Sequence, residues 1–152
     1  MNLRSLLNKK NISLNLNIES KKRLVELFAN RLATNYENVE EDNVLSNLYK
    51  RERIGSTYIG KNIYMPHCKV DGLITTKIVI FTLKNSYYDD SVDDHIKTAV
   101  GVFFPHKTSE IHTELLKQLA HFFKKTDILD NLEQIKDIDT LFKLIIKDSD
   151  ND

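Results

Sequence analysis

Two nearly continuous apolar segments set the strongest limit on what this chain can fold into. They cover residues 77–83 and 98–104 and consist mainly of isoleucine, valine and phenylalanine. Each has the length of a β-strand and lacks the alternation of apolar and polar residues of a half-exposed strand, so each predicts a strand covered on both faces. The cover must come from helices, and we therefore predict an α/β protein.

Amphipathic segments elsewhere in the chain can supply those helices. We predict helices over residues 21–33, 38–50, about 108–124, 127–132 and 139–146. Ser20 can cap the first of them, and Thr108 or Ser109 the third. The second is expected to deliver Arg51 at or just beyond its end. His112 shares the apolar stripe of the third helix and lies in its first turn, where free backbone N–H groups favour an anion.

The remaining segments predict an edge strand, a turn and a polar tail. Residues 1–19 alternate apolar and polar positions in their second half, which fits a short edge strand or an extended arm. Residues 85–94 are rich in aspartate and predict a solvated turn or hairpin tip. Residues 147–152 are polar and are expected to fray. We therefore predict one domain over residues 1–147 and a polar tail at 148–152.

Composition limits the partners and the compartment. The 152 residues contain 22 Lys and Arg and 22 Asp and Glu, so no global charge attracts nucleic acid or an anionic membrane. No apolar run approaches the roughly 18 residues that span a bilayer, and the N-terminus lacks the apolar core of a signal peptide. A single cysteine excludes an internal disulfide. We expect a cytoplasmic protein that does not insert into membranes.

Residues 51–69 form the segment with the most chemistry. They contain two of the four glycines, one of the two prolines and the only cysteine, and Pro66 presents His67 on a stiff, irregular turn. Hydroxyls and cations surround this imidazole: Ser56, Thr57, Tyr58, Tyr64, Arg51, Arg53, Lys61 and Lys69. Such groups bind phosphate, and an imidazole among them suggests phosphoryl chemistry.

The same residues also fit a purely structural interpretation. His67 can be an ordinary surface histidine, and Arg51 a solvated cation that favours the negative end of a helix dipole. Ser56 and Thr57 can bind phosphate oxygens through hydroxyl and amide groups, but a turn needs the same groups to satisfy its own backbone. Spacing alone leaves both interpretations open.

Metal and thiol chemistry are disfavoured. A set of His67, Cys68, His106 and His112 has adjacent ligands and matches no zinc pattern, and Cys68 has no second thiol or obvious base. We expect no metal and assign no role to the other histidines, namely His95, His106 and His121.

Nucleotide chemistry is disfavoured as well. Residues 55–62 come within one residue of the phosphate-loop pattern, but Asn62 replaces the hydroxyl that binds Mg²⁺. The pattern also needs a strand before it and a helix after it, whereas a predicted helix precedes this segment and Pro66 follows closely. We expect no nucleotide cofactor.

The order Arg51-Glu52-Arg53-x-Gly55-Ser56-Thr57-x-Ile59-Gly60, followed by Pro66-His67, resembles a known active-site signature. It is that of enzyme IIA domains of the fructose, mannitol and nitrogen-regulatory type in the bacterial phosphoenolpyruvate-dependent phosphotransferase system. Ser20-Lys21-Lys22, the apolar strand that ends at Pro105, and His112 before a leucine-rich helix follow in family order. The resemblance covers nearly the whole chain and implies a mixed β-sheet flanked by helices on both faces.

The resemblance also implies site roles. His67 would accept a phosphoryl group from a phosphohistidine on an HPr-type carrier, Arg51 would lie beside that group, and His112 would be the second histidine of the site. Phosphoryl transfer needs in-line positioning and charge neutralisation, so neither metal nor nucleotide on this chain is required.

Some positions depart from the family pattern. Tyr64 and Cys68 stand where small residues are frequent, Asn62 replaces a frequent glycine or serine, and His95 replaces a common proline. We expect these differences to narrow the pocket or to change which partner docks.

Three functions remain open at this point. The leading hypothesis is a freestanding phosphocarrier of the nitrogen-regulatory type, whose phosphorylation state changes its binding to regulatory targets. The second is a sugar-specific relay that passes phosphate to a separate IIB component. The third, from a different class, is a binding protein of the same fold that never carries phosphate, but such a scaffold needs neither Arg51 nor His67 nor His112.

Overall fold

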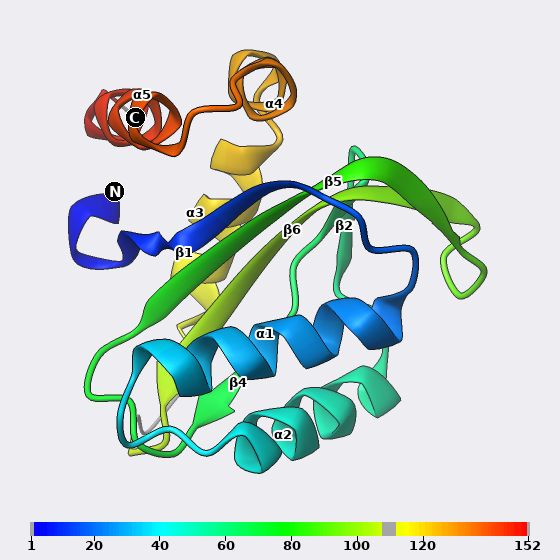
Figure 1. The fold of residues 1–152 in the computed structure, drawn as a ribbon, viewed down its shortest axis with the longest axis vertical. Helices are drawn as coiled ribbons and strands as arrows, with labels where there is room; N and C mark the ends of the chain where they lie inside the picture. The colour runs from blue at the N-terminus through cyan, green and yellow to red at the C-terminus, as the bar shows by residue number, and fades with distance from the viewer. Residues whose placement is uncertain (1, 108–111, 152) are drawn as a thin grey trace.

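A mixed β-sheet runs through the middle of the protein (Figure 1). We describe residues 2–107 and 112–151 of a computed structural model. In these residues the strands are β1 (Leu7–Leu16), β2 (Tyr58–Gly60), β3 (Ile63–Tyr64), β4 (His67–Val70), β5 (Lys77–Asp89) and β6 (Asp94–Pro105). Their order is β1-β5-β6-β3-β2, and β4 also pairs with β6. The β5–β6 and β2–β3 pairs are antiparallel and the others are parallel.

Helices cover both faces of this sheet, as predicted. The helical elements are the 3-10 turn η1 (Leu3–Ser5), α1 (Lys21–Asn35), α2 (Glu41–Ile54), α3 (Thr113–Phe123), α4 (Thr126–Gln134) and α5 (Ile138–Asp150). Helices α1 and α2 lie on one face and α3 to α5 on the other (Figure 1). Neighbouring strand residues serve opposite faces: Val79 packs with α1 and α2, whereas Ile78 and Ile80 pack with α3 to α5. The α/β prediction is confirmed.

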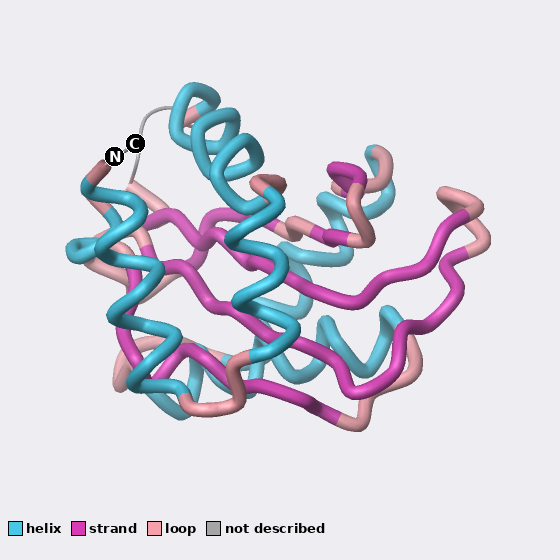
Figure 2. The backbone as a smooth tube through the Cα atoms, turned by 90° about the horizontal axis from the view of Figure 1, so that it is seen from above, coloured by secondary structure: helices cyan, strands magenta, loops and turns pink. Residues whose placement is uncertain are grey.

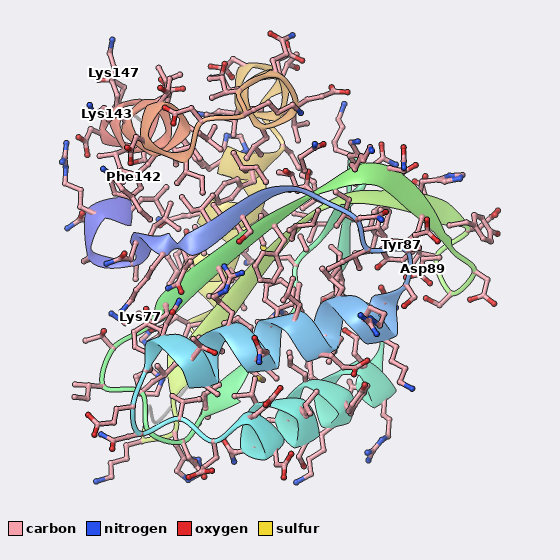
Figure 3. All side chains as sticks on the ribbon, in the orientation of Figure 1. Lys77, Tyr87, Asp89, Phe142, Lys143 and Lys147 are labelled. Atoms are coloured by element: carbon pink, nitrogen blue, oxygen red, sulfur yellow. The ribbon has the colours of Figure 1, made fainter. Side chains whose placement is uncertain are left out.

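The central hairpin is longer than its apolar segments. Strands β5 and β6 pair from Lys77 opposite Phe103 to Asp89 opposite Asp94, and the hairpin tip projects past the helices (Figure 1 and Figure 2). The predicted turn at residues 85–94 is therefore wrong in extent, since only residues 90–93 turn. Strand pairing continues because Tyr87 packs into the α1–α2 core and Asp89 is buried beside the start of α1 (Figure 3).

The edge strand and the first helix agree with the predictions. Strand β1 lies at the edge of the sheet, parallel to β5. Ser20 caps α1, because its side chain accepts a hydrogen bond from the Arg23 N–H. Buried Asn11 connects the two elements through hydrogen bonds with Asn35 and with the Tyr36 hydroxyl.

Helix α2 ends four residues later than predicted. Its apolar pattern stops at Leu48, but the helix continues to Ile54 and ends before Gly55, whose backbone is no longer helical, with φ 156° and ψ 165°. Arg51 therefore lies within the last helical turn rather than beyond it.

Helix α3 starts later than predicted, and the predicted caps Thr108 and Ser109 lie outside the described residues. His112 precedes the helix with φ −75° and ψ 77° and is exposed, so it does not share the buried stripe. Its ring lies against Phe104, with centroids 5.7 Å apart.

The last two helices complete the cover. Helix α4 lies close to its predicted position, but the predicted frayed tail is wrong, because α5 continues to Asp150. Ile146 and Ser149 share its buried face, and the Ser149 hydroxyl donates to the Ile146 carbonyl. Lys147 points away from the sheet (Figure 3). In the described part of the chain, no helix has the length and apolar character to cross a membrane.

Two glycines with nearly the same φ give a matched test of packing. Gly60 (φ 91°) has open space where a Cβ would stand, whereas a Cβ at Gly72 (φ 93°) would clash with the Asn38 carbonyl oxygen. We expect Gly60→Ala to cost about 1–2 kcal/mol from its positive φ alone. Gly72→Ala should cost about 1–3 kcal/mol more, because the backbone must move. Urea unfolding of both variants measures this difference, and equal losses would contradict it.

Candidate functional site

His67 is the first residue of β4, and its ring is fixed by the backbone. Strand β4 pairs in parallel with β6, where the Val102 N–H donates to the Pro66 carbonyl at 2.9 Å. The Nδ1 atom of His67 lies 3.0 Å from the Met65 carbonyl oxygen. Because a carbonyl can only accept, Nδ1 carries the proton, and in the neutral ring Nε2 keeps its lone pair. The geometry therefore makes Nε2 the nucleophilic atom.

The surroundings of His67 favour its neutral form. Burial lowers the pKa of the imidazole below its usual value, and the positive charge of Arg51 lowers it further. The hydrogen bond to Met65 and the negative charge of Glu52 act in the opposite direction without reversing the result. At neutral pH the ring is an uncharged base, as a nucleophile must be.

His67 opens into a pocket of about 320 Å³ that it shares with Arg51. The other lining residues are Asn47, Lys50, Ile54, Cys68, Lys69, Phe104 and His106. Within the described residues, the lining contains the cations Lys50, Arg51 and Lys69 but no carboxylate. This pocket therefore suits a small anion placed against the imidazole.

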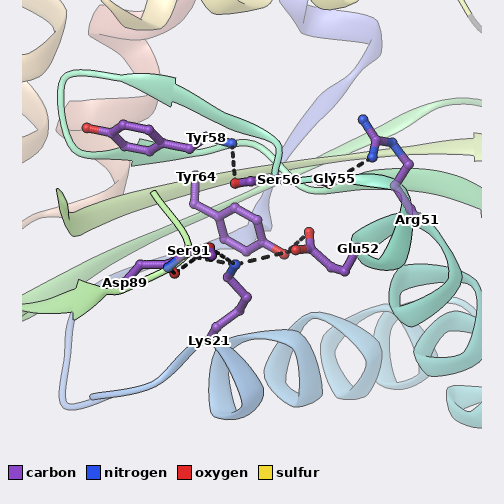
Figure 4. A network of polar contacts seen from close by, with 9 residues as sticks. All are labelled: Lys21, Arg51, Glu52, Gly55, Ser56, Tyr58, Tyr64, Asp89 and Ser91. Atoms are coloured by element: carbon purple, nitrogen blue, oxygen red, sulfur yellow. Dashed lines mark hydrogen bonds and ion pairs between the residues drawn. The ribbon is translucent and has the colours of Figure 1, made fainter. Parts of the chain in front are cut away.

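Arg51 serves the helix end and the pocket together. Its Nη1 donates to the Gly55 carbonyl at 3.0 Å (Figure 4), which satisfies backbone at the end of α2. The guanidinium carries further N–H groups, and Arg51 is among the residues that line the pocket of His67. The two interpretations of Arg51 from sequence are thus compatible with each other.

A partly buried charge network connects α1, α2 and β5, and it was not predicted from sequence. Glu52 accepts a hydrogen bond from the Tyr64 hydroxyl at 2.7 Å, and Lys21 Nζ lies 3.4 Å from Glu52 and 2.9 Å from Asp89 (Figure 4). Ser91 donates to Asp89 through its N–H and hydroxyl. One signal was available: a lysine at a helix N-terminus opposes the helix dipole and calls for carboxylates nearby.

Ser56 and Thr57 are less available to a ligand than expected. The Ser56 hydroxyl accepts from the Tyr58 N–H at 3.1 Å, as a turn requires. Thr57 is 6% exposed, and its hydroxyl has no hydrogen-bond partner among the described residues. Neither residue lines the pocket of His67, so their role in binding phosphate stays a prediction.

His112 lines a different hollow, together with Leu6, Thr76 and the start of α3. Its ring contacts Phe104, which lines the pocket of His67, so Phe104 stands between the two histidines. The structure brings Arg51 and His67 together but leaves His112 outside their pocket. Its role as the second histidine of the site also stays a prediction.

Cys68 and His106 line the pocket beside His67. Burial raises the pKa of the Cys68 thiol to about 12, so it is a poor nucleophile at neutral pH. His106, to which sequence reasoning assigned no role, lies with its Nδ1 2.9 Å from an Asp71 carboxylate oxygen. Among the described residues no group of three or more metal-binding side chains comes together.

The fold and this pocket agree with one family. The family model described as "Phosphoenolpyruvate-dependent sugar phosphotransferase system, EIIA 2" matches residues 5–148. Since the match spans nearly the whole sequence, the chain belongs to this family of phosphotransfer components.

Curated relatives include regulatory and transport proteins. A nitrogen regulatory protein of Pseudomonas aeruginosa is 28% identical over 128 residues, which are 84% of this chain and 83% of that protein. The mannitol-specific EIICBA component of the phosphotransferase system of Vibrio cholerae is 26% identical over 144 residues, which are 91% of this chain but 21% of that longer protein.

Solved structures share the fold. The nitrogen regulatory protein IIA-Ntr from Neisseria meningitidis has a TM-score of 0.81 at 22% identity, covering 93% of this chain and 97% of that one. The IIA mannitol domain from Escherichia coli has a TM-score of 0.73 at 19% identity, covering 91% and 97%.

The charges around His67 predict how it titrates. Arg51→Gln should raise the pKa of His67, because it removes a positive charge beside the buried ring. Arg53→Gln, an exposed arginine on the same helical turn, is the matched control and should leave the pKa unchanged. NMR titration of the ring measures both, and equal shifts would show that the effect is not local.

The same pKa has a consequence for stability. Because the pKa of His67 is lower in the folded protein than in the unfolded chain, the unfolded state binds more protons between the two values. This contribution to stability is therefore present above the unfolded value of 6.5 and is lost as the pH falls from there through the lower folded value.

Proposed function

We propose that the protein is a phosphocarrier that accepts a phosphoryl group on Nε2 of His67 from an HPr-type phosphohistidine carrier. One observation carries the proposal: the Nδ1–H of His67 donates to Met65, which leaves a neutral ring whose Nε2 has no hydrogen-bond partner among the described residues, in a pocket lined by cations. The family membership supports the same chemistry.

The proposed step needs only groups on the two proteins. The Nε2 lone pair attacks phosphorus, a new N–P bond forms, and the N–P bond to the donor imidazole breaks in line with it. Arg51 and the pocket lysines offset the charge on the phosphoryl oxygens. Nδ1 keeps its proton and its hydrogen bond to Met65 throughout. Neither metal nor nucleotide takes part on this chain.

We further propose that phosphorylation regulates partner proteins in the cytoplasm. A phosphoryl group adds roughly one to two negative charges to a protein whose net charge is zero. A partner that docks over His67 would have to bury this charge, which costs several kcal/mol when it is unpaired. The likeness to a nitrogen regulatory protein over 84% of the chain favours this role.

A sugar relay is the second candidate. One solved relative is a complex of an Escherichia coli mannitol IIA with phosphorylated IIB, and a mannitol-specific transport component is among the curated relatives. In this role the phosphorylated protein would pass its phosphate to a separate IIB component. A binding protein that never carries phosphate is disfavoured, because such a scaffold gains nothing from a free Nε2 beside Arg51.

The acceptor is tested with purified components. With phosphoenolpyruvate, enzyme I and the HPr-type carrier, the protein should acquire one acid-labile, base-stable phosphate. His67→Ala should abolish the labelling, since it removes the only proposed acceptor atom. His121→Ala, an exposed histidine on α3 with no assigned role, is the control and should label normally. Label that persists in His67→Ala, or that maps to Ser56 or Thr57, would overturn the assignment.

Two further variants test the roles of Arg51 and His112 in the same assay. Arg51→Lys keeps the charge but loses the planar fork, and it should slow acceptance by about tenfold or more. His112→Ala should slow transfer while the fold is retained, if that residue joins the site in the complex. Unchanged rates would assign both side chains to structure.

Regulation and sugar relay are separated by bait proteins. His67→Ala should capture regulatory targets from the native cytosol, whereas His67→Asp, which places a negative charge in the pocket, should lose them. Sugar uptake in a deletion strain is measured in parallel. Loss of uptake of one sugar, with no partner that distinguishes the two baits, would favour the relay.

A further inference from the structure

The charge network of Lys21, Glu52 and Asp89 connects three distant parts of the chain to the phosphoacceptor site. Lys21 opens α1, Glu52 lies in the last turn of α2, and Asp89 ends β5 at the hairpin tip. The side chains of these three residues are 25%, 15% and 6% exposed. Asp89 is buried and the other two are partly buried, so salt screens their attraction less than it screens pairs on the open surface.

Glu52 is the member of the network next to the site. It follows Arg51 in the chain, and its two oxygens are held by different groups: Oε1 by the Tyr64 hydroxyl and Oε2 by Lys21. Tyr64 is fully buried on β3, two residues before Pro66. The carboxylate is therefore fixed between the helix turn that carries Arg51 and the strand that leads to His67.

Lys21 is shared between two carboxylates, which makes the network sensitive to either one. Its ammonium lies closer to Asp89 than to Glu52, at 2.9 Å against 3.4 Å, and it also donates to the Ser91 hydroxyl at 3.4 Å. As long as Asp89 holds Lys21, the charge of Glu52 is only partly neutralised. Loss of Asp89 would release Lys21 to pair with Glu52 alone.

We propose that Glu52 is a positioning residue of the phosphoacceptor site, and that Lys21 and Asp89 extend its control to the β5–β6 hairpin tip. The negative charge of Glu52 opposes the effect of the positive charge of Arg51 on the protonation of His67. Through Lys21, Asp89 at the hairpin tip sets how much of the charge of Glu52 acts on the His67 ring. The inference rests on the proposed function only for its biological meaning, since the electrostatic coupling exists in the unphosphorylated protein.

The coupling would matter for transfer in both directions. A more basic imidazole is a better nucleophile, so Glu52 assists acceptance by offsetting burial and Arg51. After transfer, the same negative charge repels the phosphoryl group and favours its release to the next acceptor. A partner that contacts the hairpin tip and displaces Asp89 would weaken both effects without touching His67.

The test is an NMR titration of the His67 ring in isosteric variants. Glu52→Gln should lower the pKa of His67, because it removes the negative charge that raises it. Asp89→Asn should lower it in the same direction, because Lys21 then pairs with Glu52 alone. Asp90→Asn makes the same charge change at the next, exposed residue and should leave the titration unchanged.

The Tyr64→Phe variant separates the effect of the position of Glu52 from the effect of its charge. It keeps the Glu52 carboxylate but removes the hydroxyl that holds it, so a shift of the His67 titration is expected only if the position of Glu52 matters. Tyr87 and Arg51, which also act on the pKa of Tyr64 and of His67 respectively, are not substituted in any of these variants.

Each outcome decides part of the inference. An unchanged titration in Glu52→Gln overturns the role of Glu52. A shift in Glu52→Gln without one in Asp89→Asn, or an equal shift in Asp90→Asn, overturns the connection to the hairpin tip. None of these measurements requires phosphate transfer, so a failure of the proposed phosphocarrier function would be seen separately in the labelling assay.

Discussion

The pairing of β6 on its second edge is the constraint on which the site depends. One edge of β6 is occupied by the long strand β5, and the other receives the short strands β3 and β4 in parallel. Between them stands Pro66, which cannot donate to the sheet and so interrupts the pairing. The Pro66 carbonyl still accepts from Val102. His67 therefore follows an interruption in the strand that pairs with β6, and pairing of β3 and β4 with β6 holds the chain on both sides of it.

Opposing charges around His67 reconcile two demands on it. Burial and Arg51 keep the ring neutral, which a nucleophile needs, but they also make it less basic. The hydrogen bond to Met65 and the charge of Glu52 restore part of that basicity. Since Arg51 and Glu52 are neighbours on one helical turn, small movements of the end of α2 change both influences together.

The central architecture could be predicted from sequence because its signals are local. Continuous apolar runs predicted β5 and β6, a serine before an amphipathic segment predicted the cap of α1, and the Pro66-His67 pair predicted where the imidazole is presented. Each depends on residues a few positions apart, where propensity and burial pattern act in the same direction.

The parts that were wrong depend on distant contacts. Strand β5 continues through polar residues because Asp89 meets Lys21, which no local pattern reveals. Helix α5 continues through its polar end because Ser149 is buried against the rest of the protein and Asp150 pairs with Arg4 at 3.1 Å. The displacement of His112 from the helical stripe follows from its backbone conformation, which sequence periodicity assumed to be helical. Tertiary contacts override local preference in the first two cases.

Most residues that depart from the family pattern near the site are explained by their contacts within the fold rather than by the pocket. Tyr64 was expected to narrow the pocket or to change which partner docks. It does not line the pocket but lies in the α1–α2 core, and its hydroxyl donates to Glu52. Asn62 adopts a φ of 62°, which asparagine tolerates, and its amide donates to the His95 carbonyl. Of the departures from the family pattern, all of which lie within the described residues, Cys68 alone lines the pocket. A partner that docks here therefore meets a pocket changed by one small thiol. Tyr64 acts on the same pocket through its hydrogen bond to Glu52, the neighbour of Arg51.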